Sequence, residues 1–283
     1  MKKKRRSLEQ YREDLQERAP GGRQSLPLKD RGDGWTVIGA VSDSHLGSKH
    51  YRPDVLHYLY DRFADEGVEA VYHAGNWIEG ESRLNRHDIK IFGLDDQIDY
   101  MVQEYPQRKG ITTYYISGDD HEGWYQQRER ISIGQHLQDR ARSVGRNDLV
   151  FLGYLEADVD WVTSEGKATL RVMHGGGGTP YALSYPAQKT VESFQSGEKP
   201  DMLILGHYHK MFHSYVRSVH VVQPGCTQDQ SIFMRKKGIE AHVGGAMVYV
   251  RQHAKGFIME CAPRFMSFYD EAFTRRHFDV RGY

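Results

Sequence analysis

The stretch that decides the fold is WTVIGAVSDSH, residues 35–45, in which an apolar, strand-like run ends on an aspartate and a histidine. Four further stretches repeat this plan, each with a short apolar run followed directly by polar residues. The polar clusters are Asp43-Ser44-His45, Gly75-Asn76, Asp119-Asp120-His121-Glu122, His174-Gly175 and Gly206-His207-Tyr208-His209. Parallel strands of α/β proteins end at one edge of the sheet, and ligands bind at that edge. The sequence therefore predicts that the five clusters gather into one site.

These clusters are rich in imidazole and carboxylate groups. The two groups together suit divalent transition metals such as manganese, iron, zinc or nickel. Because the chain has 15 histidines, single pairs of this kind also arise by chance. Five clusters in the same place behind strands are a stronger signal, and they predict a metal site. His73, just before Gly75, is expected to be a packed histidine, with a place behind the metal ligands as the alternative.

Apolar periodicity indicates alternating strands and helices followed by a β-rich half. Strands are expected near residues 35–42, 71, 111–116, 150–155, 159–162, 169–173 and 202–205, and helices near 53–63, 94–102, 131–144 and 184–196. Residues 211–261 are expected to form antiparallel strands. This order fits a layered α/β sandwich better than a single doubly wound sheet. We expect a basic N-terminal extension over 1–33, helix-compatible at 7–18, a catalytic domain over 34–265 and a C-terminal tail over 266–283.

The composition is that of a folded protein in a reducing compartment. Apolar residues make up 39% of the 283 residues, and 38 basic residues balance 38 acidic ones, which argues against general adhesion to nucleic acid. Residues 1–33 hold ten basic and six acidic residues, a charge of +4, which predicts a solvated terminus or, as the less favoured reading, a polyanion contact. Cys226 and Cys261 have no metal-motif spacing. No apolar run suits a signal peptide or a membrane span, so we expect a soluble, cytoplasmic protein without membrane contact.

In this order the clusters resemble the motifs of the calcineurin-like metallophosphoesterase superfamily, D-x-H, G-[DN], G-N-H-[DE], a lone H and G-H-x-H. The pattern is most similar to the branch of repair nucleases and phage-type DNA phosphoesterases. The resemblance implies a four-layer α/β/β/α sandwich of two mixed sheets flanked by helices. It also implies two divalent metal ions at the carboxyl ends of the strands. Manganese is the expected metal, with iron, zinc and nickel as alternatives.

The resemblance also implies a role for each matching residue. The first metal would be held by Asp43, His45 and His209, and the second by His174, His207 and the residue before His121. Asn76 would occupy the bridging position. His121 would not bind metal but would protonate the leaving oxygen, a task that suits an acid with a pKa near neutrality. Glu122 would orient His121.

Two positions depart from the family pattern. The bridging residue, usually Asp, is Asn76, and the residue before the histidine, usually Asn, is Asp120. The net charge of the site is unchanged, so we interpret this as a compensating exchange, in which Asp120 takes over the bridge or one metal binds weakly. Asp119 is a rival to Asp120, which we prefer. Glu79 is a further candidate for the missing carboxylate.

The motifs leave the substrate open. Protein phosphatases of the superfamily carry a phosphate-binding arginine in the block that here reads Gly75–Glu81, and its absence argues against a phosphoprotein. Cations and aromatic groups combine in three places, as is typical of clefts that bind nucleic acid: Arg83 and Arg86, Trp124 and Tyr125, and the block 233–237. We therefore predict hydrolysis of phosphodiester bonds in nucleic acid by a metal-bridged hydroxide. The alternatives are a phosphoesterase acting on nucleotides and a non-catalytic binding protein of the same fold.

Overall fold

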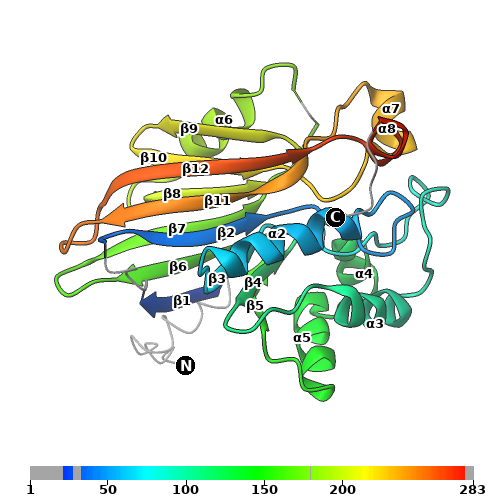
Figure 1. The fold of residues 1–283 in the computed structure, drawn as a ribbon, viewed down its shortest axis with the longest axis horizontal. Helices are drawn as coiled ribbons and strands as arrows, with labels where there is room; N and C mark the ends of the chain where they lie inside the picture. Colours follow the sequence, from blue (N-terminus) through cyan, green and yellow to red (C-terminus); the bar gives the residue numbers. More distant parts are fainter. Residues whose placement is uncertain (1–21, 28–32, 179, 278–283) are drawn as a thin grey trace, which may run out of the picture.

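Two six-stranded β-sheets lie face to face, and helices cover their outer faces (Figure 1). The computed structural model describes residues 22–27, 33–178 and 180–277. The expected helix at 7–18 lies outside these ranges. None of the described helices is long and apolar enough to cross a membrane.

The first sheet has the strand order β12-β11-β2-β3-β4-β5. Its strands are β2 (Thr36–Val41), β3 (Ala70–His73), β4 (Thr112–Ser117), β5 (Leu149–Tyr154), β11 (Val243–Gln252) and β12 (Ile258–Phe268). Strands β2 to β5 are parallel, whereas β11 is antiparallel to both β2 and β12.

The second sheet has the strand order β1-β6-β7-β8-β10-β9. Its strands are β1 (Gly22–Pro27), β6 (Glu156–Val162), β7 (Lys167–His174), β8 (Met202–Gly206), β9 (Met211–Val216) and β10 (Val219–Pro224). Strands β7, β8 and β10 are parallel, β6 is antiparallel to β7, and β9 is antiparallel to β10.

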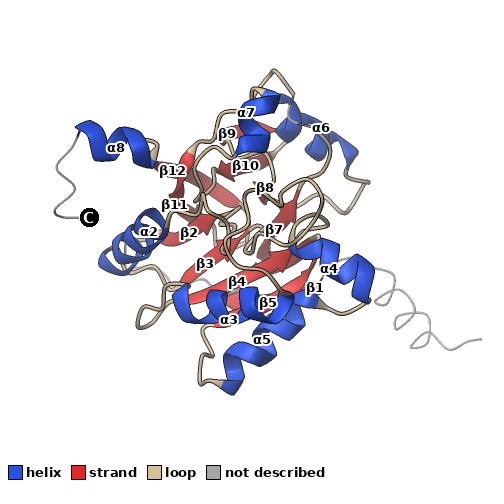
Figure 2. Ribbon diagram, turned by 90° about the vertical axis from the view of Figure 1, so that its right-hand side faces the viewer, coloured by secondary structure: helices blue, strands red, loops and turns tan. Residues whose placement is uncertain are grey.

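Helices complete the four layers. They are α2 (Pro53–Asp65), α3 (Leu94–Glu104), α4 (Glu122–Glu129), α5 (Ile133–Ser143), α6 (Tyr185–Ser193), α7 (Ile232–Lys237) and α8 (Glu271–His277). Helices α2, α3 and α5 pack on the outer face of the first sheet, and α6 packs on that of the second (Figure 2). The predicted α/β/β/α sandwich is therefore confirmed.

The core between the sheets comes from the alternation of each strand, which sends every second side chain inward. Trp161 of β6 and Tyr72 of β3 are fully buried there, and the Trp161 Nε1–H donates to the Tyr72 hydroxyl at 3.1 Å. This bond satisfies two polar groups in an otherwise apolar layer, so the layer fixes the relative position of the two sheets.

Four elements differ from the sequence expectations. Helix α4 was not predicted, and α7 interrupts the region 211–261 that was expected to hold only strands. The hydroxyl of Ser231 accepts from the Met234 N–H and so caps the start of α7. Strand β1 extends the second sheet from within the predicted N-terminal extension, because Arg23 pairs with Asp160 of β6 at 2.7 Å. Strand β12 runs to Phe268, past the predicted boundary at residue 265.

Candidate metal centre

The five predicted clusters meet at one edge of the sandwich, where the carboxyl ends of β2, β3 and β4 face those of β7 and β8 (Figure 2). Main-chain bonds lock the turns together, since the Asp43 N–H donates to the Gly75 carbonyl at 3.0 Å. The two sheets are joined at the same place, because the His207 N–H donates to Asp43 Oδ2 at 2.9 Å. The strand ends therefore position the site residues from both sheets.

Asp43, His45 and His209 form the first set of side chains that could hold a cation, here called group 1. Asp43 Oδ1 lies 3.4 Å from His209 Nε2 and 3.9 Å from His45 Nε2. The other oxygen of Asp43 accepts from the Ser42 hydroxyl at 2.5 Å. All three side chains thus point one donor atom at the same place.

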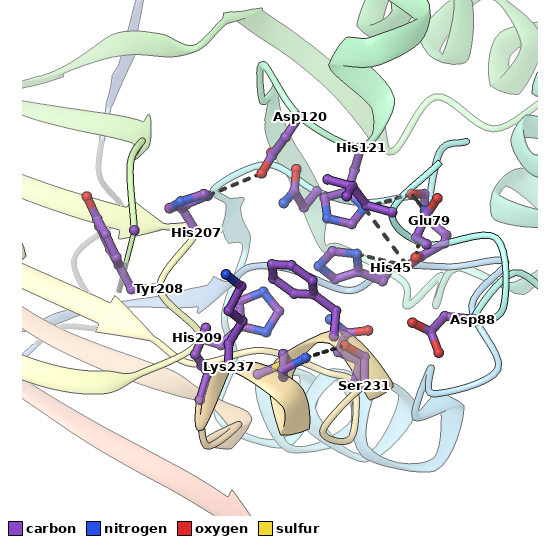
Figure 3. Close-up of a pocket in the computed structure, with 18 of the residues that line it drawn as sticks. His45, Glu79, Asp88, Asp120, His121, His207, Tyr208, His209, Ser231 and Lys237 are labelled. Carbon is purple, nitrogen blue, oxygen red and sulfur yellow. Dashed lines mark hydrogen bonds and ion pairs between the residues drawn. The ribbon is translucent and has the colours of Figure 1, made fainter. Parts of the chain in front are cut away.

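Asp120, His174 and His207 form the second set, group 2. The two carboxylate oxygens of Asp120 lie 3.2 Å from His174 Nε2 and 3.3 Å from His207 Nδ1. Figure 3 shows the pair of Asp120 and His207. The opposite ring nitrogens are held by main-chain carbonyls, at 2.7 Å for His174 and Ala74 and at 2.8 Å for His207 and Gly177. These outer bonds fix the ring orientations that metal-binding histidines need.

The positions of Asn76 and Asp119 test the predicted exchange, in which Asn76 replaces the usual aspartate and Asp120 the usual asparagine. Asn76 is buried at the carboxyl end of β3, and its side-chain oxygen has no hydrogen-bond partner in the described structure. Asp119 is exposed and belongs to neither group, whereas its neighbour Asp120 contacts both histidines of group 2. The geometry therefore favours Asp120 over Asp119 as the ligand.

The charge state of the site follows from its burial and its histidines. Burial alone would raise the pKa of Asp43 and of Asp120, but the neighbouring imidazoles outweigh it and hold both pKa values well below the usual range. Burial alone would lower the pKa of His174, but Asp120 raises it to about 10. Both carboxylates therefore stay ionised, and the site presents negative charge to a cation.

The donor atoms of the site fit a pair of cations. Five of them are buried and have no hydrogen-bond partner within the described residues: Asp43 Oδ1, His45 Nε2, Asn76 Oδ1, Asp120 Oδ1 and His174 Nε2. Each unsatisfied buried group costs about 1–3 kcal/mol unless something binds it. Imidazole nitrogens and carboxylate or amide oxygens are suitable ligands for manganese, iron, zinc or nickel. Groups 1 and 2 together with Asn76 would therefore hold two divalent ions.

Three glycines of the motifs make room for one ring, that of His174. A Cβ atom on Gly75 would lie 2.6 Å from His174 Nδ1, and one on Gly118 would lie 2.8 Å from its Cδ2. One on Gly206 would lie 2.3 Å from the Ala74 carbonyl oxygen and from Ser42 Oγ, and 3.1 Å from His174 Nδ1. Gly75 and Gly118 follow strands of the first sheet, whereas Gly206 ends a strand of the second. We call this arrangement the glycine socket; it explains why glycine precedes the polar residues in three clusters.

The backbone of the site is held in a conformation that L-residues rarely adopt. Positive φ angles of 48–84° occur at Asp43, His45, Asn76, His121, His207 and His209. Such residues cost of order 1–3 kcal/mol each and persist where the surrounding structure holds them. The tight turns at the strand ends hold them here, which brings side chains of successive turns to one point.

His121 lies between the two groups and the solvent. Its Nδ1–H donates to the Glu79 carbonyl at 2.7 Å (Figure 3). Its ring stacks on Trp124 at a centroid distance of 4.7 Å. The ring is thus fixed through one nitrogen, and Nε2 is left to give or take a proton. This placement suits the predicted acid.

Two supporting residues differ from the sequence expectations. Glu122 does not orient His121; its carboxylate accepts from the N–H groups of Asn76 and Gly118 at 2.8 and 2.9 Å, and burial raises its pKa to about 8. Glu79 has the orienting role instead, through its main chain for His121 and through its side chain for His45. Its Oε2 lies 3.2 Å from His45 Nδ1, on the ring side away from Asp43. His73 is buried and bonded to the Ser44 hydroxyl, so it is a packed histidine behind group 1.

A cleft of about 610 Å³ opens over the groups, and its wall includes side chains from three segments: Leu84, Trp124, and Phe233 with Lys237 of α7. The predicted substrate contacts are only partly placed there. Tyr125 is 4% exposed and lies inside the protein, so the prediction that it stacks on substrate is wrong. Arg83 and Arg86 are exposed but do not line the cleft. Their neighbour Leu84 does.

An α/β/β/α sandwich with two histidine–carboxylate groups at its strand ends defines the class of metal-dependent phosphoesterases. The chain belongs to the calcineurin-like phosphoesterase superfamily, whose domain profile matches residues 37–238. The resemblance seen in the sequence is thereby confirmed at the level of the superfamily.

Several solved structures are similar to this chain. One, described as a novel archaeal phosphodiesterase, is 17% identical with a TM-score of 0.43, over 82% of this chain and 100% of that one. A hypothetical protein of Pyrococcus horikoshii OT3 is 11% identical with a TM-score of 0.41, over 85% and 91%. A single mutant of Vps29 from Entamoeba histolytica is 14% identical with a TM-score of 0.37, over 83% and 100%. No curated protein matches the chain.

Proposed function

We propose that this protein hydrolyses phosphodiester bonds of nucleic acid, with groups 1 and 2 as the metal ligands and His121 as the acid. Two divalent ions in such a site neutralise a phosphate and supply a hydroxide nucleophile. The protein's own part is to hold the phosphodiester in the cleft and to give a proton to the departing oxygen. His121 Nε2 is free for that transfer, because its other nitrogen is held by Glu79.

The observation that carries the proposal is the composition of the cleft wall. Phe233 is 41% exposed and Leu84 is 71% exposed, although both are apolar and both line the cleft beside the metal ligands. Trp124 adds a second aromatic face, and Lys237 adds a cation. Aromatic faces stack on bases of any sequence and a cation attracts the backbone phosphate, so this wall suits a single-stranded or frayed polynucleotide.

Cations on both flanking segments support an extended substrate. Arg83 and Arg86 stand on the loop that carries Leu84, and Arg235 and Lys236 stand on helix α7, which carries Phe233. Within the described residues none of these four forms an ion pair with an acidic side chain. A free nucleotide would meet the cleft alone, whereas a polynucleotide would also meet these flanking charges.

The test compares four substrates with manganese-loaded protein: p-nitrophenyl phosphate, bis-p-nitrophenyl phosphate, and single- and double-stranded oligonucleotides. We expect the diester to be preferred to the monoester, and the oligonucleotides to be cut at a rate that falls with salt. Phe233→Ala should lower kcat/KM on the single strand roughly 10-fold, a stacking loss of about 1.4 kcal/mol. Hydrolysis of bis-p-nitrophenyl phosphate should be unchanged.

Ile232→Ala is the matched control, because Ile232 is the neighbouring exposed residue of α7 and does not line the cleft. A preference for the monoester, or intact oligonucleotides, would replace the proposal with a phosphoesterase of small molecules. Absence of all hydrolysis in protein with two bound metals would identify a binding protein.

A further inference from the structure

Besides groups 1 and 2 and the set His45, Glu79 and His121 that overlaps group 1, one more cluster of side chains could hold a metal, and it lies apart from the others. His213 of β9, His220 of β10 and Cys261 of β12 bring their donor atoms within 4.8 Å of one another. Both cysteines of the chain are free thiols. Because His213 follows His209 by four residues of mostly extended chain, the cluster lies roughly 13 Å further along β9 than the metal centre. A cation bound here would be separate from the two of the centre.

Strand pairing explains why these three residues meet. His213 lies opposite Val222, and Val222 belongs to the core between the sheets. Directly paired residues share a face, and so do alternate residues of one strand, so His213 and His220 also face the gap between the sheets. Cys261 packs against the same core from β12. Strands β9 and β12 are edge strands of the two sheets, and β10 contacts β12 across the gap (Figure 1).

The two imidazoles have the same unsatisfied atoms that mark the metal centre. His213 Nε2 and His220 Nδ1 are buried and have no hydrogen-bond partner within the described residues. Their ring centroids are 5.9 Å apart, close to the 5.2 Å that separates His45 from His209 in group 1 and to the 5.2 Å that separates the two rings of group 2. A pair of rings packed only for apolar contact has no reason to leave both nitrogens unpaired.

We propose that His213, His220 and Cys261 bind one zinc ion and so join the open edges of the two sheets. Two imidazoles and a thiolate form a borderline-soft ligand set, which favours zinc over the harder manganese, whereas groups 1 and 2 contain no sulfur. The thiol gives its proton to solvent when the metal–sulfur bond forms. All three residues are half-buried, and the unpaired nitrogens of both histidines are turned away from solvent. Donors of a tetrahedral zinc lie about 3.3–3.8 Å apart, so the side chains close by about 1 Å.

The test uses the full chain, stripped of metal with a chelator and then titrated with Co²⁺ as a spectroscopic substitute for zinc. We expect a sulfur-to-cobalt charge-transfer band in the near ultraviolet that saturates by three equivalents, because groups 1 and 2 also take up Co²⁺, and that disappears when Zn²⁺ is added. Cys261→Ser should lose this band. Cys226→Ser is the matched control and should keep it, because Cys226 is the other thiol of the chain. Zinc content should fall by one ion per chain only in Cys261→Ser.

Thiol labelling of the unmodified chain checks the proposal without any substitution. Zn²⁺ should slow the reaction of Cys261 with a thiol reagent at least 10-fold, and Mn²⁺ should not. A band that persists in Cys261→Ser, or equal labelling with and without Zn²⁺, would overturn the proposal. Because the readouts are a sulfur band and thiol reactivity, a failure here leaves the phosphodiesterase proposal unaffected.

Discussion

Glu79→Gln is the substitution that tests how the metal centre is supported. The Glu79 carboxylate is 3% exposed and accepts two hydrogen bonds, one per oxygen. Oε2 accepts from His45 Nδ1 at 3.2 Å, and Oε1 accepts from Asn85 Nδ2 at 2.8 Å. Glutamine has the same shape but only one oxygen. Its NH₂ group must therefore face either His45 or Asn85, donor against donor.

The loss can be estimated from that geometry. One buried hydrogen bond to a charged group is replaced by a donor–donor contact, which costs roughly 1.5–3 kcal/mol. If His45 loses its partner, the ring is no longer held with Nε2 toward group 1, and outer partners of this kind change metal affinity by about 10–100-fold. We therefore expect the affinity for manganese to fall about 10–100-fold in Glu79→Gln. The loss of kcat should be smaller once manganese is saturating.

In the assay, the metal-free protein is titrated with Mn²⁺. Binding is measured by calorimetry, and activity is measured on bis-p-nitrophenyl phosphate. Asp88→Asn is the control, because Asp88 lines the same cleft but pairs with His50, at 2.9 Å, rather than with a ligand. Unchanged affinity in Glu79→Gln with an unchanged melting temperature would refute the supporting role. Equal losses of manganese affinity in both variants would mean that the negative charge of the cleft, rather than the bond to His45, explains the effect.

Three further outcomes are expected. His121→Ala should keep both metals and lose roughly 10²–10⁴-fold in turnover, with a smaller loss for a p-nitrophenolate leaving group; loss of metal instead would identify His121 as a ligand. Asp120→Asn should weaken the metal pair, and Asn76→Asp in the same chain should restore much of it, whereas strict additivity in the four variants would exclude an exchange. Asp160→Asn should destabilise the fold by about 1–2 kcal/mol near neutral pH. Burial alone would raise the pKa of Asp160, but Arg23 and its neighbours lower it from 3.8 to about 2. The stability that Asp160 contributes is therefore present above pH 4 and is lost as the pH falls toward 2. A stability difference between the two proteins that persists in urea melts at pH 2 would contradict this prediction.

The sequence predicts those parts of the site that depend on residues adjacent along the chain. A polar cluster directly behind an apolar strand is a local property, and parallel strands then bring the clusters together, which is why Asp43 and His174 were found. Glu79 has no such signal, because its role depends on reaching back to His45 from a loop. Tyr125 follows Trp124 by one residue, and a helix sends successive side chains in different directions. The position of helix α4 had to be known before Trp124, which lines the cleft, could be distinguished from Tyr125, which is buried.

Strand β1 and helix α7 show the same limit in the fold. The sequence of β1 is short and polar, and its place depends on the pairing of Arg23 with Asp160, far along the chain. Helix α7 has only six residues and one buried side chain, so it has too few turns for an apolar stripe. Strand β1 thus depends on a contact with a distant part of the sequence, and α7 is too short for its pattern to stand out.

The glycine socket has a consequence for how this centre can diversify. The ring of His174 packs between glycines of both sheets. The distance between the ligands of the two sheets therefore depends on the distance between the sheets and on the size of this ring. The loop that carries Leu84 and the helix that carries Phe233 lie outside that stack. Exposed positions such as Leu84 and Phe233 can therefore change without moving a ligand, as long as Asn85 of the same loop keeps its bond to Glu79. Selection on the substrate and selection on the chemistry act on separate parts of the chain, which allows one reactive centre to serve many phosphate esters.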